Sequence, residues 1–150
     1  MKKIRLILSA LLIMFCVNLT SEASTIGYAD FQKVLSDYSY ARTAYKDIDS
    51  KYTELQQYAI DKEKQYKAIE SPIQRKTFED QIQKEFQMKE ERIYNLRTQK
   101  EEVIKNNILA ACKAVAAAKK LDVILDLSVV YAGGIDVTND IIQYLNTQKK

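Results

Sequence analysis

The 150-residue chain has no histidine, one proline and three glycines. Without histidine it cannot form the Ser/His or Cys/His pairs that activate many catalytic nucleophiles. It also has no glycine-rich phosphate loop. The acidic pair Glu90 and Glu91 would point apart on a helix, unlike the facing carboxylates of an acid/base pair. We therefore expect no enzymatic activity, no catalytic residues, no cofactor and no metal site.

The segment Asp136–Asp140, DVTND, has a faint similarity to a calcium-binding loop. A calcium loop of the helix-loop-helix type needs a glycine at its sixth position and a glutamate at its twelfth, and both are missing here. Capping of a following helix explains these polar residues better than metal binding does.

Residues 1–23 have the pattern of an export signal. Three basic side chains precede the apolar run Leu6–Leu19, which is shorter than the roughly 20 residues that a membrane-spanning helix needs. Ser21 and Ala23 are small residues at the positions that a signal peptidase reads, so we expect cleavage after Ala23. Retention as an N-terminal anchor and lipidation at Cys16 are the alternatives, and the two bulky residues before Cys16 disfavour lipidation.

The net charge argues against a nucleic-acid partner. Removal of residues 1–23 would lower the formal charge from +3 to +1, whereas strong nucleic-acid binding usually needs a clear basic excess. The same charge allows only a weak contact with an anionic membrane surface. Cys112 would be the one cysteine left, and its alanine-rich surroundings predict a buried side chain, with an intermolecular disulfide as the alternative.

The stretch Asp30–Leu121 contains no glycine and one proline, which favours long helices. Apolar residues in its first half recur in alternating steps of three and four, as in a helix packed along its length against another helix. The members of this seam, with one lysine among them, are Phe31, Val34, Tyr38, Ala41, Tyr45, Ile48, Tyr52, Leu55, Ala59, Lys62, Tyr66 and Ile69. In the second half, Lys89, Lys100 and Asn107 occupy seam positions expected to be apolar, which predicts a helix pair that bends.

The single proline marks the turn between the two helices. Ser71 is placed as an N-cap, Pro72 as the first helical residue, and Gln74 as the partner that completes a capping box. One helix would then cover Phe31–Glu70 and the next Pro72–Lys119, with lengths of about 60 and 72 Å. Rods of similar length joined by so short a turn should fold back as an antiparallel coiled-coil hairpin over residues 31–120, with its tip near residues 70–72.

The two ends of the chain read as a small β body. Strands are expected at Thr25–Ala29, Val123–Leu127 and Val129–Tyr131, and Gly133–Gly134 should end the third strand. Thr138 or Asn139 should then cap a last helix. The fold class is therefore α+β and predominantly α, with a three-stranded base and a long helical hairpin.

The base, residues 24–30 and 121–150, is smaller than the about 40 residues that usually fold unaided. Its strands carry apolar side chains that need burial, and a slim hairpin cannot wrap them. We therefore expect an obligate oligomer in which copies complete one another. The residues expected in this interface are Ile26, Tyr28, Val123, Leu125, Val129 and Tyr131.

The chain from Ser24 onward resembles the Skp/OmpH family of periplasmic chaperones. The matching stretches are IGYADFQKVLSDYSYAR near the front, the hairpin, and AVAAAKKLDVILDLSVVYAGGIDVTNDIIQYLN at the end. The resemblance implies a homotrimer in which strands of three subunits close a small barrel and the hairpins surround a cavity. It also implies a periplasmic protein that holds unfolded outer-membrane β-barrel proteins there without ATP.

Residues near the hairpin tip are the candidates for client binding on the cavity wall. They are Lys62, Lys64, Lys67, Ile69, Ile73, Arg75, Lys76 and Phe78. Simple solvation of a helix surface is the alternative for each of them. Residues 61–92 contain eight basic and eight acidic side chains, so attraction to acidic clients by charge alone is not expected. A structural coiled-coil spacer of the cell envelope would show the same hairpin, and it is the competing functional interpretation.

Overall fold

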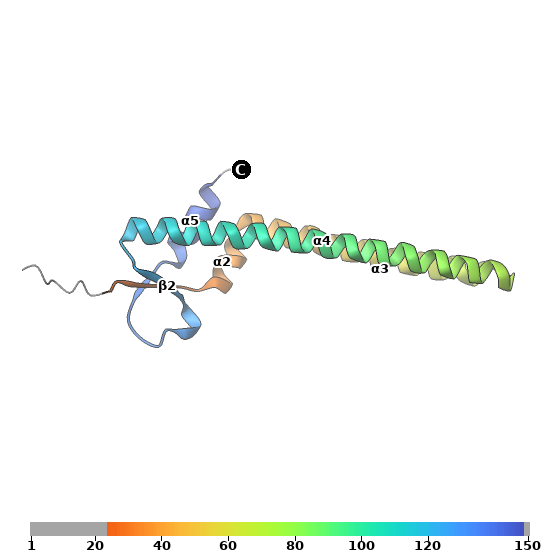
Figure 1. The fold of residues 1–150 in the computed structure, drawn as a ribbon, viewed down its shortest axis with the longest axis horizontal. Coiled ribbons are helices and arrows are strands. Elements are labelled where there is room, and N and C mark those ends of the chain that lie inside the picture. The colour runs from red at the N-terminus through yellow and green to blue at the C-terminus, as the bar shows by residue number, and fades with distance from the viewer. Residues whose placement is uncertain (1–23, 149–150) are drawn as a thin grey trace, which may run out of the picture.

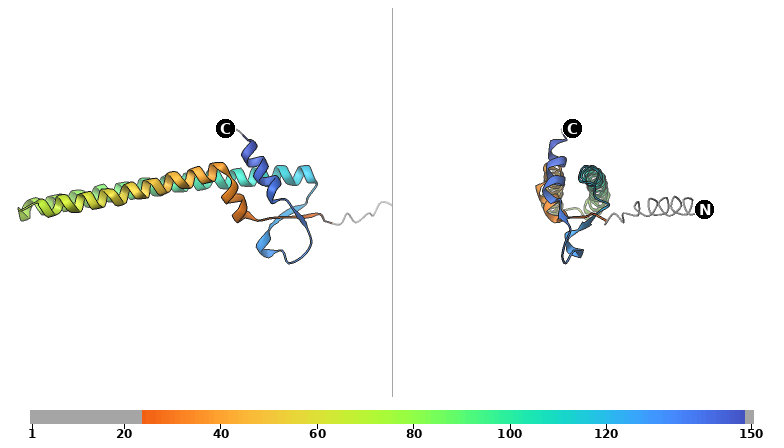
Figure 2. Two further views of the ribbon diagram at one scale, coloured as in Figure 1. Left: turned by 180° about the vertical axis from the view of Figure 1, so that it is seen from behind. Right: turned by 90° about the vertical axis from the view of Figure 1, so that its left-hand side faces the viewer.

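The computed structural model describes residues 24–148, so the predicted export signal lies outside the described residues. The chain is mostly helical, with a small three-stranded sheet at one end (Figure 1). Helices α3 (Ser39–Ala68) and α4 (Pro72–Lys119) run side by side as a long hairpin that projects from a body containing the sheet and α5 (Figure 2). The predominantly α fold with a small sheet is thus confirmed.

The first rod does not begin where the heptad pattern suggested. Phe31–Asp37 forms a separate helix, α2, and Tyr38 interrupts the rod with an extended backbone (φ −76°, ψ 110°) before α3 begins. The prediction of one helix from Phe31 was therefore wrong. At the front of α2, the Asp30 carboxylate caps the helix by accepting a hydrogen bond from the Lys33 N–H at 3.0 Å.

A side chain far along the sequence stabilises the break between α2 and α3. Asn146, on helix α5 (Thr138–Thr147), accepts from the Ser39 N–H and donates to the Asp37 carbonyl, both at 2.9 Å. The buried Tyr38 ring is fixed in turn, because its hydroxyl accepts from the Asn107 amide at 2.9 Å. Since the break leaves backbone groups without helical partners, these tertiary hydrogen bonds explain why the break is stable here.

The hairpin tip lies where the proline predicted it. Helix α3 ends at Ala68, Ser71 is extended, and Pro72 opens α4. The capping box was wrong, because the Ser71 side chain makes no capping hydrogen bond. Instead, the Arg75 guanidinium closes the turn by donating to the Ile69 carbonyl at 2.6 Å while lying over the Tyr66 ring.

The sheet is parallel and has the order β2-β1-β3. The first strand, β1 (Ile26–Ala29), lies between β2 (Val123–Asp126) and the two-residue β3 (Ile135–Asp136). The prediction of a third strand at Val129–Tyr131 was wrong. The Asp126 carboxylate accepts from the Ser128 N–H at 2.8 Å and starts the 3₁₀ turn η2 (Leu127–Val129), which ends β2.

The glycine pair comes before the third strand rather than after it. Gly133 and Gly134 have φ of 79° and 89°, a region that other residues rarely adopt. A β-carbon at Gly134 would also lie 3.1 Å from the Tyr28 ring. The loop needs glycine here because it must turn left-handed and pass close over β1.

The predicted cap of the last helix at Thr138 or Asn139 was wrong, because Val137 is at the N-cap position and the Asp136 side chain, two residues before Thr138, makes the hydrogen bonds at the helix start. Its carboxylate accepts from the backbone N–H and the hydroxyl of Thr138, at 2.9 and 2.6 Å. These two hydrogen bonds hold the pKa of Asp136 below its ordinary value. Thr138 is instead the first helical residue, and its hydroxyl accepts from the Asp30 N–H at 3.0 Å, so it ties α5 to the end of β1.

The hydrophobic core lies in the body, where α5 packs against α2 and against the last turns of α4. Every element around it contributes small or β-branched side chains that allow close packing. The buried core residues are Ala29, Val34, Tyr38, Ala41, Ala44, Ile104, Ala111, Val115, Leu121, Val137, Ile141 and Leu145. None of the six residues expected in the oligomer interface is among these core residues.

Replacing Asn146 by alanine should lower the free energy of unfolding by about 1 kcal/mol, because two backbone groups at the break lose their partner. Urea unfolding at fixed protein concentration measures the effect. The change Gln143→Ala on the exposed face of the same helix is the control. Equal midpoints for the two variants would contradict the role given to Asn146.

Candidate functional site

The distal half of the hairpin has no buried residue. Leu55 on α3 and Ile93 on α4 are the last buried side chains toward the tip, and residues 56–92, all of them described, are exposed or half-buried. Several of these are large and apolar, and Ile73 at the tip is 81% exposed. The distal hairpin thus presents apolar and aromatic groups that the chain's own core does not cover.

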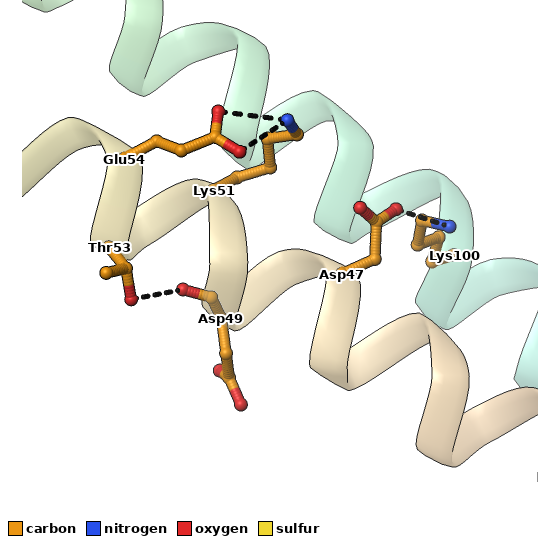
Figure 3. A network of polar contacts seen from close by, with 6 residues as sticks. All are labelled: Asp47, Asp49, Lys51, Thr53, Glu54 and Lys100. Atoms are coloured by element: carbon orange, nitrogen blue, oxygen red, sulfur yellow. Dashed lines mark hydrogen bonds and ion pairs between the residues drawn. The ribbon is translucent and has the colours of Figure 1, made fainter.

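The polar residues in the seam of α4 all have partners across the hairpin. The Lys100 ammonium lies 3.1 Å from the Asp47 carboxylate on α3 (Figure 3). Asn107 donates to Tyr38, and the Lys89 ammonium lies 4.7 Å from the centre of the Tyr58 ring. These contacts set the register between the helices where an apolar seam would be expected. The predicted bending of the hairpin stays a prediction.

Other contacts in the same region stay within one helix. The Lys51 ammonium lies 2.8 Å from the Glu54 carboxylate, and the Thr53 hydroxyl donates to the Asp49 carbonyl at 3.0 Å (Figure 3). These local contacts support α3 by itself. Only the pair of Asp47 and Lys100 in this view joins the two helices.

Tyr58 is the centre of a second polar cluster nearer the tip. Its hydroxyl donates to the Glu85 carboxylate on α4, and the ammonium groups of Lys62 and Lys89 lie 5.3 and 4.7 Å from its ring centre. Burial, together with this hydrogen bond, raises the pKa of Tyr58 to about 12. The hydrogen bond also lowers the pKa of Glu85, so the proton stays on the phenol.

The cations proposed for client binding are all engaged within the chain. Their partners lie on the same helix or across the tip, at distances typical of exposed contacts. Lys64 pairs with Asp61 (3.9 Å), Lys67 with Glu63 (2.6 Å) and Lys76 with Asp80 (2.9 Å), while Lys62 lies over Tyr58 and Phe78 and Arg75 holds the Ile69 carbonyl. The tip is therefore not a patch of unpaired positive charge.

The apolar candidates divide between two hollows. Ile69, Ile73 and Phe78 line a shallow hollow at the tip. Phe78 and Lys62 also line a groove of about 670 Å³ between α3 and α4. The remaining cationic candidates, Lys64, Lys67, Arg75 and Lys76, line neither of them.

Sequence reasoning missed four apolar residues of this groove, which are Ala59, Tyr66, Ile82 and Phe86. Two of them, Ala59 and Tyr66, had been assigned to the seam that joins the helices. Their spacing predicted that they lie on the side of the helix that faces the other helix. It did not predict that their side chains remain partly exposed there. The proposed client-binding set as a whole stays a prediction.

Four of the predicted interface residues share one face of the sheet. Side chains alternate along a strand, and the parallel register pairs Ile26 with Val123 and Tyr28 with Leu125. Because Ala29 and the intervening Gly27 are buried toward the helices, these four face away from them. Ile26 and Val123 are 41% and 39% exposed. Val129 and Tyr131 are exposed in the loop after β2 rather than in a strand.

Other kinds of site find no support in the described part of the chain. No group of three or more acidic or cysteine side chains within residues 24–148 is arranged to hold a metal ion. No helix in this range is long and apolar enough to cross a membrane. Cys112 is only partly buried, and burial raises the pKa of its thiol.

The pair of Asp47 and Lys100 should couple energetically, because it joins two helices and Lys100 is largely shielded. A double-mutant cycle with Asp47→Ala and Lys100→Ala, followed by urea unfolding, should give a coupling of about 0.5 kcal/mol. The control cycle on Lys51 and Glu54 should give a smaller value, since that pair is exposed and local. A larger coupling in the control would contradict the role of the cross-hairpin pair.

Comparison with known proteins identifies the family. The model of the family described as outer membrane protein (OmpH-like) matches residues 25–145. Among solved structures, a proposed outer membrane chaperone (OmpH-like) from Caulobacter crescentus CB15 is 12% identical, with 85% of this chain and 86% of that chain covered and a TM-score of 0.45. That structural likeness is too distant to carry an argument, and no curated protein matches. Because the family match spans most of the sequence, the protein belongs to the OmpH-like family.

Proposed function

We propose that the protein is an ATP-independent holdase that binds unfolded outer-membrane β-barrel proteins and prevents their aggregation. The observation that carries the proposal is the apolar and aromatic surface of residues 56–92, which no core of this chain covers. Membership of the OmpH-like family supports it, because the resemblance to that family implies a chaperone of outer-membrane proteins. Large exposed apolar patches normally mark binding surfaces.

The chemistry of this surface suits a client that must be held and then released. Tyrosine, phenylalanine and isoleucine side chains give many weak contacts, and none of the described cavities near the tip is deep enough to enclose a client. Many weak contacts from several hairpins can add up to firm holding, while each of them breaks easily. Release then needs no nucleotide.

We further propose that the outer face of the sheet assembles the chain into a homotrimer whose strands close a small barrel. Ile26, Tyr28, Val123 and Leu125 form an apolar face on a sheet whose other face is covered by helices. The exposed side chains of Val129 and Tyr131 lie in the adjoining loop and would join the same interface. The trimer would place three hairpins around one cavity, as the family resemblance implies.

The proposed place of action is the periplasm, which follows from the export pattern of residues 1–23 and from the client class. The competing proposal is a structural spacer of the cell envelope. The cross-hairpin contacts at Tyr38, Asp47 and Tyr58 favour it to the extent that they stiffen the hairpin. A spacer would not act on unfolded proteins, and this difference can be measured.

The holdase proposal predicts suppression of aggregation. A urea-unfolded outer-membrane β-barrel protein is diluted into buffer with the purified chain, without ATP, and light scattering is followed. Scattering should reach its minimum at a molar ratio near one chaperone oligomer per client. An oligomeric chain that leaves scattering unchanged would contradict the holdase and favour the spacer.

The trimer proposal predicts that charges introduced on the outer face of the sheet dissociate the trimer into single chains. The double change Ile26→Asp and Val123→Asp places two carboxylates in the proposed interface, and burial of unpaired charge is costly. The mass from light scattering should fall from three subunits to one. Ile73→Asp at the exposed tip is the matched control and should keep the wild-type mass. An unchanged mass for the double variant would contradict this interface.

A further inference from the structure

The groove between the distal halves of α3 and α4, here called the distal groove, has an apolar floor. Tyr66 from α3 and Phe78, Ile82 and Phe86 from α4 line it. The three residues from α4 are half-buried and lie four residues apart, so they form one stripe along the helix. The volume of about 670 Å³ lies in the range of sites that bind compact ligands or several side chains.

The rim of the distal groove is acidic. Glu63, Glu79 and Glu90 line it together with one basic residue, Lys62. All three glutamates are exposed, and the Glu63 carboxylate also pairs with the Lys67 ammonium at 2.6 Å. The Lys62 ammonium is turned toward the aromatic rings and lies 5.7 Å from the centre of Phe78. A segment that enters the groove therefore meets more negative than positive charge, although residues 61–92 as a whole are balanced.

We propose that the distal groove binds stretches of unfolded client in which alternate apolar or aromatic side chains are flanked by lysine or arginine. This inference rests on the proposed holdase function and names the client segments that the hairpin selects. The apolar floor takes the alternate side chains that an extended chain directs to one side. The acidic rim takes the cations that flank them, and it repels acidic segments and anionic lipid.

The charges of the groove set selectivity rather than tight binding. Exposed ion pairs contribute little each and are screened by salt, so a single groove binds weakly and releases quickly. Several hairpins that act on one client would combine these weak contacts. Segments held in separate grooves would stay apart from one another, which suits a client that aggregates through strand edges.

The test uses two short fluorescent peptides and the full oligomeric chain. Both peptides alternate phenylalanine or valine with serine, and they differ only in carrying lysine or glutamate at the same flanking positions. Fluorescence anisotropy at low salt should show that the lysine peptide binds more tightly. The double variant Glu79→Lys and Glu90→Lys should bind it about tenfold more weakly, since two rim attractions become repulsions.

The matched control is the double variant Glu91→Lys and Glu102→Lys. It has the same change of charge and the same spacing on α4, and both residues are exposed outside the groove. It should bind the lysine peptide as the wild type does. Phe86→Ser should weaken the binding of both peptides without changing their order of affinity, because it removes part of the apolar floor and leaves the acidic rim intact.

Failure of the groove and failure of the holdase give different results. Equal affinity for the two peptides, or an equal loss in both double variants, would show that the groove does not select by charge. A change of oligomer mass in the Glu79→Lys and Glu90→Lys variant would show that the groove contacts a second copy instead. Suppressed client aggregation with no peptide preference would leave the holdase standing without this groove. Peptide preference without suppression would remove the holdase and keep the groove as a peptide site.

Discussion

The rest of the structure depends on where the chain buries its apolar surface. Helix α5 packs Ile141 and Leu145 against the base of the hairpin, beside Val137 at its N-cap, and the buried core lies within that region. Asn146 on the same helix fixes the break at Tyr38, which directs α3 along α4. Since burial of apolar surface is the main source of stability, the body is the stable part of the chain. The distal hairpin depends on helix propensity and a few cross-hairpin contacts.

This uneven distribution leaves two surfaces that are available for binding, at opposite ends of the molecule (Figure 1). One is the outer face of the sheet around Tyr28, which the proposed trimer would cover. The other is the distal hairpin, whose apolar side chains are half-buried at best. A surface that is already unpacked can bind a client without first losing internal contacts, and so binding there costs the body no stability. The proposed holdase function uses this separation of assembly from binding.

Much of the fold could be predicted from local pattern, because the single proline and the heptad spacing are local signals. The break at Tyr38 could not, since its cause is a side chain 108 positions later in the sequence, at Asn146. The prediction of a strand at Val129–Tyr131 was wrong because the Asp126 carboxylate starts a turn, whereas the apolar residues that follow suggested a strand. For the candidate site, the charged residues could be counted in the sequence, but their ion pairs could not be predicted from it. Because Lys67 and Lys76 form ion pairs, the tip is not a patch of unpaired positive charge.

The central claim is that the assembled chain holds an unfolded client. Native mass spectrometry of the chain mixed with a urea-diluted outer-membrane β-barrel protein tests it most directly, because it reports assembly and binding in one spectrum. The account predicts a dominant species of three chains and one client, which dissipates when the client folds into detergent micelles. A spectrum of free chain oligomers with the client absent or aggregated would contradict the account.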